Sequence, residues 1–222
     1  MDSRGAPGEG PTGEIGGGLF FVHLFRIHLG IRKAGKRKMI HVVAVGEVGA
    51  DLLQKLGARL YQIFGVGCEL GPDMSLPVSM RGKGGKSGVD GIELLEKVHS
   101  TRHLPRSKDI TIYITTKALK SVKLPTGVQE QPQSLSLPEK GCGLVSLSGL
   151  TSGKAGGNAA AQLTARASRL AVHEVGHLLG LRHCVEAKCA MYPPWTPAFA
   201  ASETVQLCAF CQDKCEQKLE ET

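Results

Sequence analysis

Two histidines one helical turn apart, inside a long helix-forming segment, constrain this chain more than any other feature. His173 and His177 flank Glu174 in the sequence His-Glu-Val-Gly-His, which follows a stretch rich in alanine and leucine. A spacing of four residues places both imidazoles on one face of a helix, where they can bind a single metal ion. Glu174 lies beside them, where its carboxylate can take a proton from water at that metal. The segment therefore predicts a helix that carries a metal site on one face.

The residues after this helix supply a third candidate ligand. Gly180 can adopt the left-handed conformation that ends a helix, and His183 then completes the pattern HExxHxxGxxH. Three protein ligands with one open position are typical of catalytic zinc, whereas structural zinc sites are closed by four ligands. HExxH alone also occurs on solvated helix faces, so His183 is what makes the interpretation specific. We predict that His173, His177 and His183 hold a catalytic zinc ion.

The seven cysteines indicate a second metal site rather than a disulfide framework. Their number is odd, and four of them form two close pairs near the C-terminal end, as in metal-binding segments. These four are Cys184, Cys189, Cys208 and Cys211. Cys215 follows in the same region and could replace Cys208 or Cys211 as a ligand. Cys68 and Cys142 are expected to be buried small apolar groups.

Upstream of the metal segment, strand patterns alternate with helix patterns, which predicts a layered α/β domain. We expect strands at 40–45, 66–70, 109–115 and 143–148, and helices at 47–64, 91–99 and 159–179, the last with Asn158 as its N-cap. Glycine and polar residues flank the strand at 143–148, so we place it at an edge of the sheet. The Pro- and Cys-rich chain beyond Gly180 is expected to be irregular.

The C-terminal spacing resembles that of the metzincin clan of metallopeptidases and, within it, the archaemetzincin family. The shared pattern is HExxHxxGxxHCx4CxM, which runs from His173 to Met191 and is followed by CxxC at Cys208 and Cys211. The match is dense over 173–211 and looser over roughly 39–215. The resemblance implies a single compact α/β domain. Its twisted mixed sheet would have an antiparallel edge strand and pack on long helices, followed by an irregular zinc-bound C-terminal segment.

The resemblance also implies roles for the site residues. Glu174 would be the general base of peptide-bond hydrolysis, and Met191 would be the methionine of a turn beneath the catalytic zinc. The two cysteine pairs would bind a structural zinc ion, so two zinc ions per chain are expected. The implied activity is that of a zinc metallopeptidase acting on peptides or proteins. The alternative is a zinc-stabilised binding module whose histidine site is idle.

Composition and charge bear on partners and location. An apolar fraction of 41% and a charged fraction of 21% are typical of a globular protein. Residues 1–38 hold seven basic and three acidic residues, which supply +4 of the net charge of +7. We therefore expect a basic extension rather than a nucleic-acid-binding surface, and a monomer. The apolar stretch at 19–31 follows net negative charge and is interrupted by His23, Arg26 and His28, so no secretory signal is expected. It is also too short and polar to span a membrane, and a cytoplasmic location is expected.

The boundary that we predict falls at residue 38. Residues 1–38 are expected to be a flexible extension or the product of a mis-set translation start, and 39–222 to form the metallopeptidase domain, including the zinc-binding segment 184–215. The glycine-rich loop at 80–91 contains Gly85, Lys86 and Ser87 but has Met80 where a phosphate-binding loop requires glycine. No nucleotide site is expected there.

Overall fold

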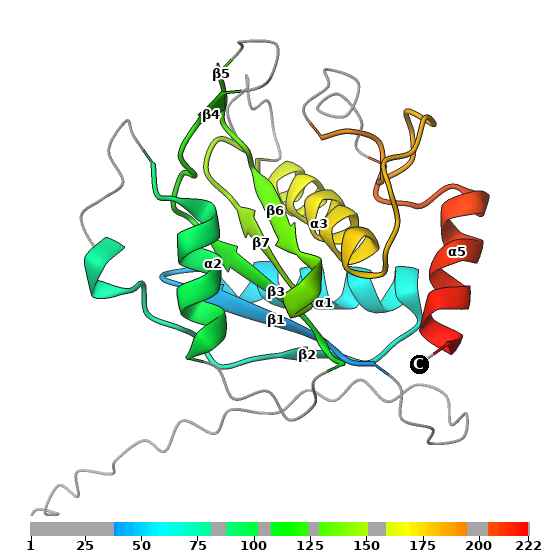
Figure 1. The fold of residues 1–222 in the computed structure, drawn as a ribbon, viewed down its shortest axis with the longest axis horizontal. Coiled ribbons are helices and arrows are strands. Elements are labelled where there is room, and N and C mark those ends of the chain that lie inside the picture. Colours follow the sequence, from blue (N-terminus) through cyan, green and yellow to red (C-terminus); the bar gives the residue numbers. More distant parts are fainter. Residues whose placement is uncertain are drawn as a thin grey trace, which may run out of the picture.

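A five-stranded mixed sheet forms the centre of the protein (Figure 1). The computed structural model describes residues 38–80, 88–101, 108–123, 129–150, 159–194 and 204–221. The sheet has the order β2-β1-β3-β7-β6. Its strands are β1 (Ile40–Val45), β2 (Cys68–Leu70), β3 (Ile110–Thr115), β6 (Ser134–Leu137) and β7 (Cys142–Ser146). Two short strands, β4 (Val122–Lys123) and β5 (Gln129–Glu130), pair separately.

All neighbours in the sheet are parallel except the last pair. β1 pairs in parallel with β2 and β3, and β3 with β7, whereas β6 runs antiparallel to β7. The three central strands are buried along their whole length, which agrees with their continuous apolar and β-branched sequences. The fold class expected from the sequence is thus confirmed, including its antiparallel edge strand.

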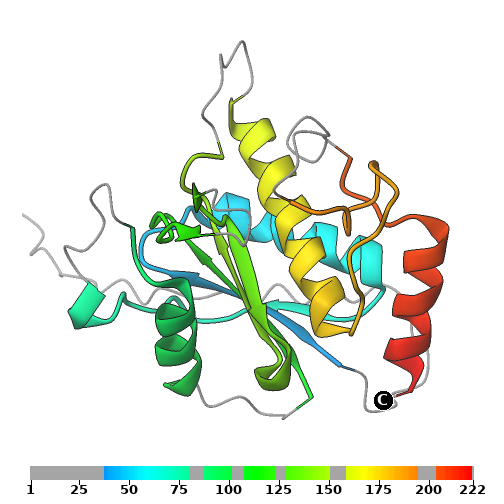
Figure 2. The same cartoon turned by 45° about the horizontal axis from the view of Figure 1, so that its top comes forward.

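Helices cover both faces of the sheet (Figure 2). They are α1 (Ala50–Phe64), α2 (Gly91–Ser100), α3 (Ala159–Leu178) and α5 (Ala209–Glu220), with short 3-10 turns η1 (Val78–Met80) and η2 (Pro138–Lys140). α1 and α3 pack on one face, against the side chains of Val42 and Ala44. α2 packs on the other face, against Val43 and Val45. None of the described helices is long and apolar enough to cross a lipid bilayer.

The sequence located most elements but assigned the wrong strand to the edge of the sheet. The strand predicted at 143–148 is β7, which lies between β3 and β6 and is buried at every residue. The edge strand is β6, whose alternating sequence Ser-Leu-Ser-Leu was not recognised. Leu135 and Leu137 pack toward α2, while Ser134 and Ser136 lie on the side of α3. The antiparallel strand thus shields β7 from solvent.

Two other elements differ from the prediction. α1 begins at Ala50 rather than at residue 47, because Gly49 is its N-cap. The chain after Gly180 was expected to be irregular, but Ala209–Glu220 forms the helix α5. Several expectations lie outside the described residues: the nature of residues 1–37, Asn158 as an N-cap, and the conformation of 81–87.

Candidate metal centres

The end of α3 brings three imidazoles together. His173 is buried and His177 half-buried, one turn apart on the same helix. Gly180 has φ of +86°, as expected for the left-handed residue that ends a helix, and its N–H donates to the His177 carbonyl over 2.9 Å. The chain then turns back, and the ring of His183 lies 5.2 Å from that of His173 and 4.9 Å from that of His177. One nitrogen from each ring lies within 4.8 Å of the other two.

Hydrogen bonds to carbonyl oxygens fix the orientation of two of these rings. His173 Nδ1 donates to Ala190 O over 2.7 Å, and His177 Nδ1 donates to Leu181 O over 2.9 Å. A carbonyl can only accept, so both rings carry their hydrogen on Nδ1. Their Nε2 atoms then face each other over 3.0 Å with lone pairs that repel unless a cation lies between them. Metal-binding histidines are oriented by bonds of this kind.

The histidine cluster fits zinc in spacing and in protonation. A tetrahedral ion about 2.0–2.1 Å from each nitrogen separates its ligands by about 3.3 Å, close to the observed distance. Burial lowers the pKa of His173 to about 3, with His177, His183 and Arg169 acting in the same direction and the bond to Ala190 opposing them. Burial also lowers the pKa of His183. Both rings are therefore neutral near pH 7, which is the form that binds metals.

Glu174 follows the first histidine and is buried, with 3% of its surface exposed. Burial raises the pKa of its carboxyl group, while the hydroxyls of Ser134 and Ser136 and the nearby His177 act in the opposite direction. Ser134 Oγ lies near the carboxyl group without meeting the geometry of a full hydrogen bond. A buried carboxylate with a raised pKa beside a metal site is a suitable proton acceptor.

Two glycines allow the close packing around this site. A Cβ at Gly143 of β7 would lie 3.2 Å from Cβ of Glu174, so the glycine lets α3 approach the sheet. A Cβ at Gly176 would overlap Sδ of Met191, which is fully buried against the helix between the two histidines. Met191 therefore packs against α3 at Gly176, which lies between Glu174 and His177. Neither glycine was identified from the sequence, since both contacts are tertiary.

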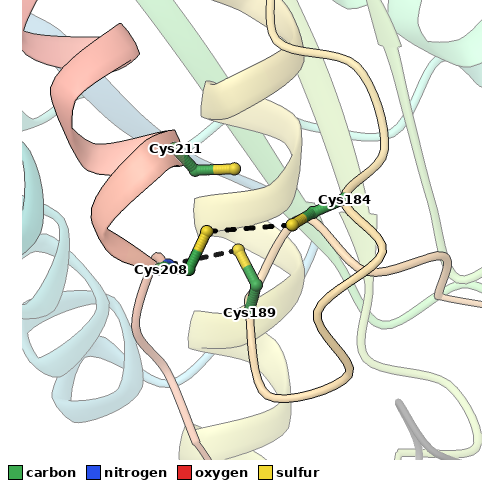
Figure 3. A group of neighbouring side chains, drawn as sticks. All are labelled: Cys184, Cys189, Cys208 and Cys211. Atoms are coloured by element: carbon green, nitrogen blue, oxygen red, sulfur yellow. Dashed lines mark hydrogen bonds between the residues drawn. The ribbon is translucent and has the colours of Figure 1, made fainter.

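The four paired cysteines converge in a second cluster (Figure 3). Cys184 follows His183 directly, Cys189 lies in the next loop, Cys208 is the N-cap of α5 and Cys211 lies in its first turn. Their sulfurs all lie within 4.8 Å of one another, and those of Cys184 and Cys208 are 3.8 Å apart. A tetrahedral zinc ion with Zn–S distances of about 2.3 Å separates its sulfurs by about 3.8 Å. The donor set thus fits a closed zinc site.

Backbone donors around the cluster favour thiolates. Cys189 Sγ accepts from the N–H groups of Cys208 and Met191 over 3.3 and 3.5 Å, and Cys184 Sγ accepts from that of Glu186 over 3.4 Å. Burial opposes ionisation of Cys208, but hydrogen bonds from Cys211, Cys184 and Cys189 outweigh it and lower its pKa. These hydrogen bonds favour the thiolate form of Cys208.

The remaining cysteines lie apart from the group of four. Burial raises the pKa of Cys215, one turn after Cys211, to about 12, and its sulfur is not among those that converge. Cys142 is buried and Cys68 half-buried, and burial likewise raises the pKa of each thiol to about 12. All three behave as small apolar groups in the packing.

Comparisons with known proteins agree with this geometry. The family model described as matrixin, a peptidase family, matches residues 99–209, which is half of the chain. A comparison with curated protein sequences found no match.

Three solved structures share the fold of this chain. A zinc-dependent peptidase from Methanocorpusculum labreanum superposes with a TM-score of 0.64 at 20% identity, covering 79% of this chain and 99% of its own. Archaemetzincin from Methanopyrus kandleri superposes with a TM-score of 0.66 at 13% identity, covering 86% of this chain and 99% of its own. Archaemetzincin from Archaeoglobus fulgidus, complexed with malonate, superposes with a TM-score of 0.59 at 20% identity, covering 79% of this chain and 99% of its own. The chain therefore has the archaemetzincin fold over nearly the whole length of these proteins.

Proposed function

The chain belongs to the matrixin family of zinc metallopeptidases, and on that premise we propose that it hydrolyses peptide bonds at the histidine cluster. His173, His177 and His183 are the proposed ligands of the catalytic zinc ion. The proposal rests mainly on the Nε2 atoms of His173 and His177, which lie 3.0 Å apart. In each ring, Nδ1 donates its hydrogen to a backbone carbonyl, so Nε2 carries a lone pair and no hydrogen. The third imidazole, brought back by Gly180, completes a catalytic donor set with a position left for substrate.

Glu174 is the proposed general base and acid. Zinc at this site supplies Lewis acidity, which lowers the pKa of water and polarises the carbonyl group of the substrate. Glu174 accepts a proton from the attacking water and then returns it to the amine nitrogen that leaves. Its burial beside His177 supports this role, because a raised pKa makes the carboxylate a stronger base.

The cysteine cluster is proposed to hold a second zinc ion with a structural role. Its four sulfurs come from two separate stretches of chain, 184–189 and 208–211. A closed tetrahedral site fixes such loops and contributes directly to folding. Two zinc ions per chain follow from the two donor sets, and Met191 is the proposed methionine of the turn beneath the first of them.

The edge strand β6 is the proposed binding site for an extended substrate. Ser146 N–H donates to Gln133 O over 2.7 Å, so the residues that bond to β7 are Gln133, Leu135 and Leu137. The backbone N–H and C=O groups of Ser134 and Ser136 consequently point away from β7. Because β6 also lies beside Glu174, a peptide that pairs with this strand would lie across the histidine cluster.

Other expectations from the sequence are retained as proposals. Residues 39–222 form the catalytic domain, preceded by a basic extension at 1–38, and the active species is a monomer without a nucleic-acid partner. The use of cysteines as a thiolate cluster rather than a disulfide framework supports a reducing compartment such as the cytoplasm.

A single substitution tests the chemistry. Glu174→Gln keeps the shape of the side chain but removes the proton acceptor, so peptide hydrolysis should fall by about 100- to 10,000-fold. Metal analysis should show the same zinc content as the unmodified chain, since Glu174 is not a proposed ligand. Glu96→Gln, on α2 against the opposite face of the sheet, controls for the loss of a charge. Undiminished hydrolysis by the Glu174 variant would remove Glu174 from the mechanism.

A further inference from the structure

A short segment, 187–191, contacts both metal clusters at once. Cys189 contributes a sulfur to the cysteine cluster, and the carbonyl of the next residue, Ala190, accepts the hydrogen bond from His173 Nδ1. The following residue, Met191, packs against Gly176 between the two helical histidines, and its carbonyl accepts from Cys184 N–H over 2.8 Å. A displacement of Cys189 would therefore move the carbonyl that orients His173.

Arg169 holds this segment against α3. It lies one turn before His173 on the same helix, and its side chain is buried, with 1% of the residue exposed. Its Nη2 donates to Ala187 O over 3.2 Å and to Cys189 O over 3.1 Å. One of these carbonyls belongs to the cysteine ligand itself and the other lies two residues before it. Both bonds come from one nitrogen, whose two hydrogens the planar guanidinium holds in fixed directions.

The positive charge of Arg169 is opposite in sign to the net charge that a zinc-filled cysteine cluster would carry. A buried guanidinium is costly unless opposite charge or hydrogen bonds compensate it. Burial lowers the pKa of Arg169, whereas Cys189 raises it. Four thiolates around one divalent zinc ion leave a net charge of about −2. The filled cluster is thus a source of negative potential next to the guanidinium.

We propose that Arg169 is a positioning residue that couples the two metal sites, holding the 187–191 segment so that the cysteine cluster keeps His173 oriented for its metal. The inference rests on the proposed function, because it assumes that the histidine cluster binds zinc. Weakening the contact at Arg169 should lower the metal affinity of the histidine site, although Arg169 touches neither the metal nor the substrate. Loss of a group that orients a metal ligand typically costs about 10- to 100-fold in affinity.

The test uses the full chain loaded with cobalt(II), because cobalt reports the two sites separately. Cobalt at the cysteine cluster gives sulfur-to-metal charge-transfer absorption, whereas cobalt bound by three imidazoles does not. Arg169→Met removes the donors and the charge at similar length. In this variant, chelator competition should show histidine-site affinity reduced by about 10- to 100-fold, while the charge-transfer band still reaches full intensity. Arg169→Lys keeps the charge but not the planar donor group, so its histidine-site affinity should fall between those of the unmodified chain and of Arg169→Met.

Arg166→Met is the matched control, because Arg166 lies on the same helix but donates to Leu150 O over 2.6 Å. Its histidine-site affinity should equal that of the unmodified chain. Equal affinity in a folded Arg169→Met variant would overturn the coupling. If circular dichroism shows that Arg169→Met does not fold, the test passes to Arg169→Lys. Unchanged histidine-site affinity in that variant would then overturn the proposed coupling. Failure of the unmodified chain to bind cobalt at the histidine site would count against the proposed function itself.

Discussion

At the residue scale, spacing along the chain identified the histidines and cysteines that converge in the two clusters, but not the groups that position them. Histidines and cysteines have few other reasons to recur at ligand spacing, so their chemistry could be inferred without knowledge of the fold. Arg169, Gly176 and Ser136 have many possible roles in a sequence. Their contacts with Cys189 O, Met191 and Glu174 arise only when distant segments pack together.

Gly176 gives a prediction at this scale. Alanine in a helix interior normally stabilises by up to about 1 kcal/mol relative to glycine, but here its Cβ would overlap Met191 Sδ in a fully buried position. Overpacking of this kind costs about 1–3 kcal/mol. Gly176→Ala should therefore lower the free energy of unfolding, measured by urea denaturation of the zinc-loaded chain.

Gly57 in α1 provides the matched substitution. It is also a buried helical glycine, but a Cβ there would meet Cys68 Sγ at 3.5 Å and Leu70 Cδ2 at 3.7 Å, which are ordinary contacts. Gly57→Ala should leave stability unchanged or raise it by up to about 1 kcal/mol. If both alanine variants were equally stable, Met191 would not be held against α3 as described.

At the element scale, two errors of the sequence interpretation have separate causes. β7 was placed at the edge because of the residues around it, but strand order depends on which segments pair in space. α5 was missed although Cys211, Cys215 and Leu219 recur at helical spacing and turn toward the core. Because the cysteines were interpreted only as metal ligands, these three residues were not recognised as the apolar face of a helix.

The position of β6 gives a prediction at this scale. Ser136→Pro removes an N–H that points away from β7, so the pairing of β6 with β7 should survive while an extended substrate loses one donor. One hydrogen bond contributes about 1 kcal/mol, which corresponds to a roughly 5-fold higher KM. Ser136→Ala, which loses the hydroxyl but keeps the N–H, separates the backbone effect from that of the side chain. Equal KM values for the two variants would show that the substrate does not pair there.

At the scale of the whole molecule, two apolar layers cover the sheet and a cysteine-rich segment follows it. The layered α/β arrangement could be predicted, because strand-like and helix-like patterns alternate over residues 40–115. The association of α5 with the rest could not, since it depends on sulfurs from 184–189 meeting those of 208–211. The likeness to solved structures at 13–20% identity shows that this architecture is compatible with very different sequences.

Three imidazoles are proposed to hold one zinc ion, and four cysteines to hold another. This proposal can be tested by the zinc content per chain of the unmodified protein and of His183→Gln, measured by atomic emission after gel filtration. We expect about two zinc ions in the unmodified chain and one in the variant, whose cysteine thiols should stay protected from alkylation. Two zinc ions in the variant, or a single one in the unmodified chain bound only by cysteines, would contradict it.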